Sequence, residues 1–222
     1  MEEHKVKILK LEEVTHDVKR FTLEKPPGYS FHAGQATEVA INKPEWKEER
    51  RPFTFTCLNK DPYLEFTIKR YPDHNGVTNA LHQLQIGDEL LLHDVWGTIE
   101  YKGKGVFIAG GAGVTPFIAI LRQLYKDGKI EGHKLIFANK TVEDIIMRNE
   151  FEKMLGKNFI NVLSRETLAG MHHGYLTKEF LQEEIQDFSQ HFYVCGPDPF
   201  MDVVKVALGE LGAKPDVLVF EK

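Results

Sequence analysis

A glycine-rich turn between an apolar run and an amphipathic run is the feature that most constrains the fold of this chain. Residues 106–109, Val-Phe-Ile-Ala, predict a buried strand, and the turn that follows contains Gly110, Gly111 and Gly113. Glycine lets backbone N–H groups approach a ligand closely, and a helix N-terminus carries a partial positive charge. The turn therefore predicts the strand-turn-helix unit of an α/β domain and a site for a phosphate-bearing ligand. A tight turn without a ligand is the alternative.

The residues after the turn predict the start of a helix. Thr115 is the expected N-cap, and Pro116 suits the first helical position. Apolar residues then recur at helical spacing until Gly128, which is a suitable stop. The turn matches only part of the G-x-G-x-x-G dinucleotide fingerprint, because Pro116 stands where the third glycine belongs.

The first hundred residues predict an antiparallel β-barrel of six strands. Short, partly alternating apolar runs are separated by turn-forming residues, a spacing typical of small barrels. One short helix interrupts them at 79–84, with Thr78 as its N-cap. The six runs lie at 6–10, 18–23, 36–41, 53–57, 64–69 and 89–93.

Beyond Gly97 the pattern changes to strands that alternate with helices. That alternation is typical of a parallel sheet with crossover helices. We therefore expect two domains, a barrel over residues 1–101 and an α/β parallel-sheet domain over residues 102–222. The strand-like runs of the second domain lie at 106–109, 135–138, 159–163, 192–195 and 217–220.

Composition excludes several classes of function. The net charge of −5 at pH 7 gives no general attraction for a nucleic-acid backbone. No apolar run reaches membrane-spanning length and no apolar signal region opens the chain, so we expect a cytoplasmic protein without a membrane partner. Its two cysteines, Cys57 and Cys195, lie far apart. They disfavour a disulfide framework, an iron–sulfur cluster and a cysteine zinc site.

Four short segments in a fixed order carry a resemblance to a known family. The first segment opens a barrel strand, the second opens the barrel helix, and the third opens the first helix of the second domain. The fourth segment follows the fourth strand of that domain. With this layout the chain resembles the ferredoxin–NADP reductase superfamily, in particular its short flavodoxin reductase-like members without a fused ferredoxin domain. The segments are Arg51-Pro52-Phe53-Thr54, Gly76-Val77-Thr78, Gly110–Pro116 and Cys195–Pro199.

The resemblance implies that residues 51–54 hold a flavin. Arg51 would pair with a cofactor phosphate, because a guanidinium fork suits phosphate oxygens. Phe53 would pack against the isoalloxazine ring, and the Thr54 hydroxyl would hydrogen-bond near flavin N5. The alternative is that Phe53 and Phe55 belong to the barrel core and that Arg51 is a surface charge.

A second flavin-phosphate site is implied at the barrel helix, by Gly76, Val77 and Thr78. Two phosphate sites fit a diphosphate, so FAD is expected rather than FMN. Backbone contacts to the flavin are implied for Ile68, Lys69 and Arg70. An ordinary capped helix and plain solvent-facing charges are the alternatives.

The second domain is implied to bind a pyridine nucleotide. Its phosphates would lie on the turn that includes Gly110, Gly111, Gly113, Thr115 and Pro116. The nicotinamide would lie beside Cys195, Gly196 and Pro197, just past the end of a strand, where α/β sheets bind ligands. The alternative is that Cys195 is simply a buried small side chain.

The family resemblance also implies a cofactor preference. Ser164 and Arg165 end the third strand of the second domain, where such a pair contacts the 2′-phosphate of NADPH. NADPH is therefore expected and NADH is the second possibility. Glu166 follows at once and offers an alternative partner for Arg165.

The C-terminus departs from the family pattern. Glu221 matches an acid that assists near the nicotinamide, but the aromatic residue that usually follows is missing. The flavin face is then less shielded unless Phe220 covers it. The adjacent His172 and His173 point apart on an extended segment and have no further ligand at suitable spacing, so we expect no metal.

Together these residues predict a flavin-dependent oxidoreductase with Thr54, Cys195 and Glu221 as its catalytic residues. Hydride would pass from NAD(P)H to FAD, and electrons would then pass singly to a small redox protein: a ferredoxin, a flavodoxin or an oxygenase component. The cofactors carry the redox chemistry and the protein supplies geometry. A non-catalytic nucleotide- or redox-sensing module on the same fold is the alternative.

Overall fold

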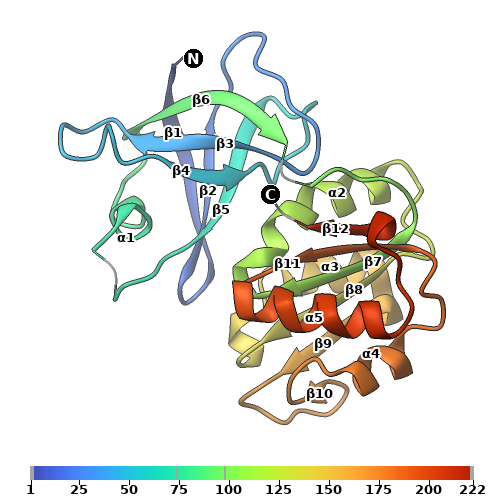
Figure 1. Ribbon diagram of the computed structural model, residues 1–222. Helices are drawn as coiled ribbons and strands as arrows, with labels where there is room; N and C mark the ends of the chain where they lie inside the picture. Colours follow the sequence, from blue (N-terminus) through green and yellow to red (C-terminus); the bar gives the residue numbers. More distant parts are fainter. Residues whose placement is uncertain (1–2, 74, 98, 221–222) are drawn as a thin grey trace.

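The computed structural model describes residues 3–73, 75–97 and 99–220 and contains two sheets, one in each half of the chain (Figure 1). The first half is a six-stranded antiparallel sheet with the strand order β4-β3-β6-β1-β2-β5. Its elements are β1 (His4–Thr15), β2 (Val18–Glu24), β3 (Gln35–Ile41), β4 (Arg51–Thr54), β5 (Tyr63–Lys69), the short helix α1 (Val77–Leu81) and β6 (Glu89–Gly97).

The two edge strands meet and close the sheet into a barrel. Phe55, directly after β4, forms an antiparallel bridge with Phe66 of β5. The Thr56 N–H donates to the Glu65 carbonyl at 2.9 Å. Because side chains alternate across a strand, Phe55 and Phe66 point into the barrel and are fully buried, and Phe55 stacks on Phe31 at 4.1 Å between ring centroids. The predicted six-stranded barrel is confirmed, with Phe55 in its core.

The barrel helix differs from the prediction in its bounds and its cap. α1 begins at Val77 and ends at Leu81, and its N-cap is Gly76. Thr78 lies inside the first turn and caps nothing. The physical reason is burial: Val77 and Leu81 both enter the barrel core, and that packing sets the start of the helix two residues earlier than the hydroxyl suggested.

The second half is a six-stranded parallel sheet with the order β10-β9-β8-β7-β11-β12. The predicted parallel sheet with crossover helices is confirmed. Its strands are β7 (Gly105–Gly110), β8 (Lys134–Asn139), β9 (Phe159–Leu163), β10 (His172–His173), β11 (His191–Cys195) and β12 (Leu218–Phe220), and its helices are α2 (Thr115–Lys126), α3 (Arg148–Leu155), α4 (Lys178–Glu184) and α5 (Asp198–Glu210). The two-residue strand β10 was not expected, because its histidines carry no apolar strand signal.

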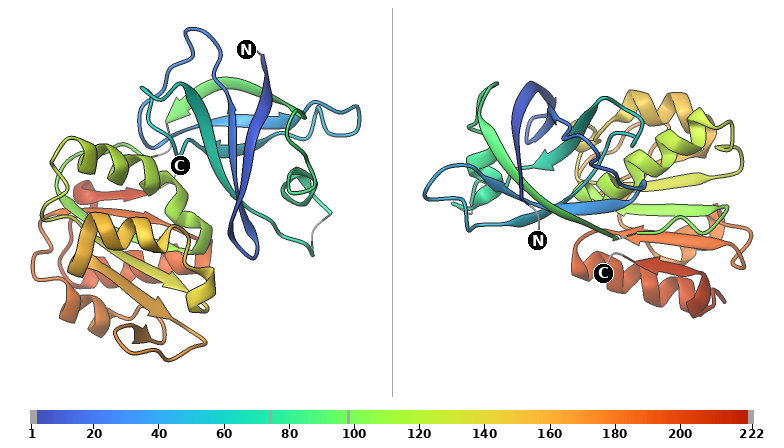
Figure 2. Two further views of the ribbon diagram at one scale, coloured as in Figure 1. Left: turned by 180° about the vertical axis from the view of Figure 1, so that it is seen from behind. Right: turned by 90° about the horizontal axis from the view of Figure 1, so that it is seen from above.

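Helices cover both faces of this sheet, as the view from above in Figure 2 shows. Side chains of β7 alternate between the faces: Phe107 packs with α2 and α3, whereas Val106 and Ile108 pack with α4 and α5. Both layers are apolar and buried, which explains why the strands are continuous apolar runs. Among the described residues no helix is both long and apolar enough to cross a bilayer.

The barrel and the parallel sheet share a buried junction. Val18 of β2 and Ile99 belong to the same apolar cluster as Ile120 of α2. Gly34 makes the approach possible: it has φ +93°, and a Cβ there would lie 2.1 Å from the Ile99 carbonyl oxygen and 3.1 Å from Ile120 Cδ1. The chain can pass this point only without a side chain.

Substitution of Gly34 tests the junction. We expect Gly34→Ala to destabilise the protein by about 3–5 kcal/mol, because backbone strain and a clash with a carbonyl act together. Gly28→Ala is the matched control, since Gly28 also has positive φ, +78°, but nothing lies within 4 Å of its Cβ position. Gly28→Ala should lower the free energy of unfolding by only about 1–2 kcal/mol. Urea unfolding measures both, and equal losses for the two variants would contradict a tight junction.

Candidate functional site

The carboxyl ends of four parallel strands form one side of a large cleft. β7, β8, β9 and β11 run side by side in parallel register, so the segments that follow them meet at one edge of the sheet. A cavity of about 970 Å³ opens there, and Lys69 and Tyr71 of the barrel line its other side. The cleft therefore lies between the two domains.

Many of the site residues predicted from sequence line this cleft and others do not. Those that line it are Lys69, Gly110, Gly111, Gly113, Thr115, Ser164, Cys195, Gly196 and Pro197. Pro116 is buried in α2, and Arg165 is exposed and does not line the cleft. Glu221 lies outside the described residues.

The glycine turn has a different local structure from the one expected. Gly111–Val114 form a 3₁₀ turn that runs straight into α2, so Thr115 already has helical φ and ψ of −58° and −42°. Its hydroxyl donates back to the Ala112 carbonyl at 3.0 Å. The prediction that Thr115 is the N-cap is therefore wrong, and Val114 holds that position. The Thr115 N–H donates to the Ala112 carbonyl and Pro116 has no N–H, so any donors for an anion must come from the glycine turn that precedes α2.

The glycine turn and the Cys195 segment touch through their backbones. A Cβ on Gly113 would lie 2.4 Å from the Cys195 carbonyl oxygen, and no real Cβ contact is that short. Cys195 is buried at 2% exposure at the end of β11. The two segments therefore form one continuous wall of the cleft, and a side chain at position 113 would force them apart.

Asn139 is a candidate site residue that the sequence reasoning did not select. It ends β8, is 9% exposed and lines the cleft. Its Nδ2 amide has no hydrogen-bond partner among the described residues. A buried donor without a partner is costly, so this amide fits a site in which a ligand supplies the acceptor. The signal in the sequence is an amide side chain directly after a buried parallel strand.

The strand ends also show how a phosphate could be recognised. Ser164 and Lys140 both line the cleft. The Glu166 carboxylate accepts from the Val142 N–H at 2.8 Å, and it is not paired with Arg165. The alternative pairing of Glu166 with Arg165 is therefore not made in the part of the chain that the structure describes. Tyr175, 77% exposed, stands at the rim of the same cleft.

The barrel strand at 51–54 offers an exposed cation and a nearly buried hydroxyl. Arg51 is exposed, with its guanidinium 3.4 Å from Glu49. Thr54 is 7% exposed, and none of the described residues hydrogen-bonds its hydroxyl. Phe53 is partly buried against the barrel core. Pro52 is exposed beside it.

The neighbouring barrel residues divide between core and surface. A cavity of about 340 Å³ between the 43–46 loop and α1 is lined by Gly76 and Trp46. Val77 and Ile68 point into the core, so only their backbone groups can reach a ligand, and the Ile68 carbonyl already lies 2.8 Å from His82 Nε2. Arg70 lines a separate cavity.

Phe220, the residue expected to be able to shield a flavin, is held within the second domain. It lies on β12 and packs against the apolar cluster formed with α4 and α5. Lys205 of α5 places its ammonium 5.6 Å from the ring centroid. These contacts direct the ring toward α5.

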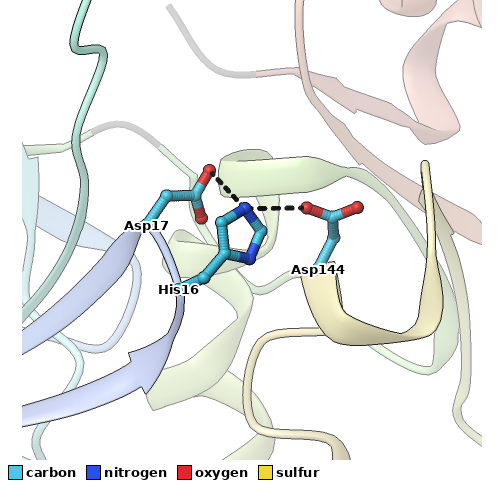
Figure 3. A group of neighbouring side chains, drawn as sticks. All are labelled: His16, Asp17 and Asp144. Atoms are coloured by element: carbon cyan, nitrogen blue, oxygen red, sulfur yellow. Dashed lines mark ion pairs between the residues drawn. The ribbon is translucent and has the colours of Figure 1, made fainter.

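One group of side chains could hold a cation. His16, Asp17 and Asp144 place their ligand atoms within 4.8 Å of one another, where the β1–β2 turn meets the second domain (Figure 3). The Lys69 ammonium already lies 2.8 Å from Asp17. Burial alone would raise the pKa of Asp17, but Lys69 outweighs it and holds that pKa below its usual value. His172 and His173 lie apart from this group, against Glu184 and the Glu166 carbonyl.

The two halves of the chain match two protein-family models. Residues 5–101 match the oxidoreductase FAD-binding domain, and residues 107–206 match the oxidoreductase NAD-binding domain. The chain therefore contains an FAD-binding and an NAD-binding domain.

Individual relatives agree with this assignment. An NADH-cytochrome b5 reductase 2-A of Vanderwaltozyma polyspora is 27% identical over 88% of this chain and 71% of its own length. A glycine betaine monooxygenase reductase subunit of Chromohalobacter salexigens is 29% identical over 94% of this chain and 61% of its own length. A solved ferredoxin NADP⁺ reductase of Neisseria gonorrhoeae with bound FAD and NADP has a TM-score of 0.82 at 20% identity, covering 97% of this chain and 95% of its own. The chain thus spans only part of the length of the curated relatives.

Asn139 provides a test of the cleft that does not require activity. We expect Asn139→Leu to weaken binding of NADP⁺ about 3- to 10-fold, the value of one hydrogen bond, while the free protein stays folded. Asn161→Leu is the matched control, because Asn161 is also buried in a strand with one unpartnered polar atom but does not line the cleft. Isothermal titration calorimetry measures both affinities. Equal affinities for Asn139→Leu and the unchanged protein would show that the amide does not meet the ligand.

Proposed function

This chain belongs to the ferredoxin–NADP reductase superfamily, and we propose that it is an NAD(P)H-dependent flavoprotein reductase that passes electrons to a separate redox protein. The observation that carries the proposal is the cleft, which opens at the carboxyl ends of the parallel strands and faces the barrel. A donor bound on one wall of this cleft would meet a flavin held by the other domain.

The residues present fit both cofactors. The unpartnered Asn139 amide and the closely packed Gly113 backbone suit a nucleotide in the cleft. The nearly buried Thr54 hydroxyl and the exposed Arg51 guanidinium suit the flavin ring and the flavin phosphate. When bound, the flavin supplies the atom that accepts hydride and the ability to release electrons one at a time.

The work of the protein's own residues is positioning. N–H groups of the glycine turn before α2 would bind the donor's phosphates, and Cys195 would limit how the nicotinamide lies against the wall. Thr54 would orient the flavin by hydrogen bonding, and Glu221 would assist hydride transfer near the nicotinamide. Hydride transfer needs the reacting atoms about 3–3.5 Å apart, so this positioning decides the rate. No general base is needed for that step.

We propose NADPH as the preferred donor, with NADH also accepted. Lys140 and Ser164 line the cleft after β8 and β9, where a 2′-phosphate would be recognised. Glu166, the nearest carboxylate after β9, is turned to the Val142 N–H. Arg165 is exposed, and its backbone N–H donates to the Lys140 carbonyl at 2.9 Å, so it stands beside these residues.

The acceptor proposed is a small redox protein, such as a ferredoxin, a flavodoxin or an oxygenase component. The support comes from relatives named as a monooxygenase reductase subunit and a cytochrome b5 reductase. Among the described residues Cys57 and Cys195 are buried and form no disulfide, and burial raises the pKa of Cys57 to about 12, so that thiol stays protonated and unreactive.

Purified protein supplied with FAD tests the function. We expect one FAD per chain, a yellow complex, and bleaching under anaerobic conditions by NADPH with a larger kcat/KM than by NADH. Lys140→Glu should reverse that order, because it places a negative charge where the 2′-phosphate is expected. Failure of the protein to bind flavin would overturn the proposed reductase function and would favour a sensing module. Bleaching by NADH alone would overturn only the preference for NADPH.

A further inference from the structure

Arg122 of α2 joins the two domains through a partly buried set of hydrogen bonds. Its Nη1 donates to the Thr56 carbonyl at 2.6 Å and to Glu65 Oε1 at 2.7 Å, both in the barrel half. Its Nε and Nη2 donate to the two carboxylate oxygens of Glu150 in α3, at 2.6 and 2.9 Å. The Arg122 side chain is 17% exposed and that of Glu65 is 7% exposed. One guanidinium thus holds groups of both domains.

The barrel side of this contact is itself fixed. The Thr56 hydroxyl donates to Glu65 Oε1 at 2.8 Å and lies 3.2 Å from the Thr67 hydroxyl. Arg20 of β2 lies 3.8 Å from the other Glu65 oxygen. Arg122 therefore binds a point where the segment just after β4 and the middle of β5 are already held together, so the position of Arg122 follows theirs.

Both elements that Arg122 joins lead into the cleft. α2 begins at Thr115, which lines the cleft, and Arg122 lies about 10 Å further along the same helix. On β5, Glu65, Thr67 and Lys69 share one face, and Lys69 lines the cleft about 13 Å from Glu65. Thr54 is the last residue of β4 and precedes Thr56 by two residues.

We propose that Arg122 is a positioning residue that sets the distance between the nucleotide turn at Gly110–Thr115 and the strand that carries Thr54. The inference rests on the proposed hydride transfer between a donor on that turn and a flavin on that strand. A displacement of about 1 Å can lower such a rate by about 100-fold, so a contact that fixes the two walls acts on the rate. A guanidinium suits the task because its planar fork bonds in several fixed directions at once, which an ammonium does not.

A second polar contact between the domains is much weaker. His16 Nε2 lies 3.8 Å from Asp144 Oδ1, and the His16 side chain is 58% exposed. Solvent screens a contact of this kind, whereas the Arg122 contact is shielded. Loss of His16 should therefore leave the separation of the two walls unchanged.

Variants of the full FAD-loaded chain test the proposal. The variants are Arg122→Met, Arg122→Lys and Glu65→Gln, with Arg148→Met as the matched control. Arg148 makes an exposed bond of 2.8 Å to Glu152 on α3, within one domain. The measurements are flavin content, the affinity for NADP⁺, and the limiting rate of flavin reduction by NADPH in stopped flow. Hydrogen exchange of residues 51–58 and 115–126 in the FAD-free protein gives a readout independent of activity.

We expect Arg122→Met to lower the limiting rate about 10- to 100-fold with flavin content unchanged and NADP⁺ affinity within about 3-fold. The limiting rates of Arg122→Lys and Glu65→Gln should lie between those of Arg122→Met and the unchanged protein. The limiting rate of Arg148→Met should equal that of the unchanged protein. The rate of hydrogen exchange in both segments should rise at least about 10-fold in Arg122→Met and should stay unchanged in Arg148→Met.

Two results would overturn the positioning role. One is an Arg122→Met protein that reduces its flavin at the unchanged rate with unchanged exchange. The other is equal effects of Arg122→Met and Arg148→Met. If Arg122→Met does not fold, Glu65→Gln decides in the same way, because it keeps the side-chain volume and removes only the charge. Failure of the unchanged protein to reduce its flavin would instead refute the proposed function, and the two failures are thereby distinguished.

Discussion

The contact between α2 and the barrel is the constraint on which the rest of the structure depends. The helix starts at the glycine turn, packs Ile120 into the junction beside Gly34, and places Arg122 between Glu65 and Glu150. Removing one partner from a buried ion pair of this kind typically costs about 3–5 kcal/mol, because a charge is left uncompensated. The cleft keeps its shape because one of its walls is the first turn of this anchored helix.

Local patterns predicted most of the architecture. Alternating apolar runs gave all six barrel strands, and the alternation of strands with helices gave the parallel sheet, because both periodicities report which face is buried. The glycine turn was placed correctly between β7 and α2, since glycine and proline act locally. The two predicted N-caps were wrong because a hydroxyl alone does not set a helix start: core packing sets it near Thr78, and a 3₁₀ turn sets it near Thr115.

The interactions that organise the cleft were beyond sequence reasoning because their partners lie far apart in the chain. Arg122 contacts Glu65, which is 57 positions away in the sequence, and Thr56, which is 66 positions away. No local pattern marks such pairs. The orphaned amide of Asn139 becomes informative only when its surroundings are known, whereas its place after a buried strand was visible. Arg165, by contrast, matched a motif and yet lies outside the cleft, since a motif fixes the backbone position and leaves the side-chain direction open.

The central claim is that the cleft presents one face of a nicotinamide to a flavin held by the barrel. The most direct measurement is reduction of the FAD-loaded protein with NADPH deuterated at C4 on one face or the other, followed by mass analysis of the NADP⁺ formed. The account predicts complete loss of deuterium from one of the two labelled donors and complete retention in the other. Loss from both donors would contradict it, because a donor fixed against one wall exposes only one face.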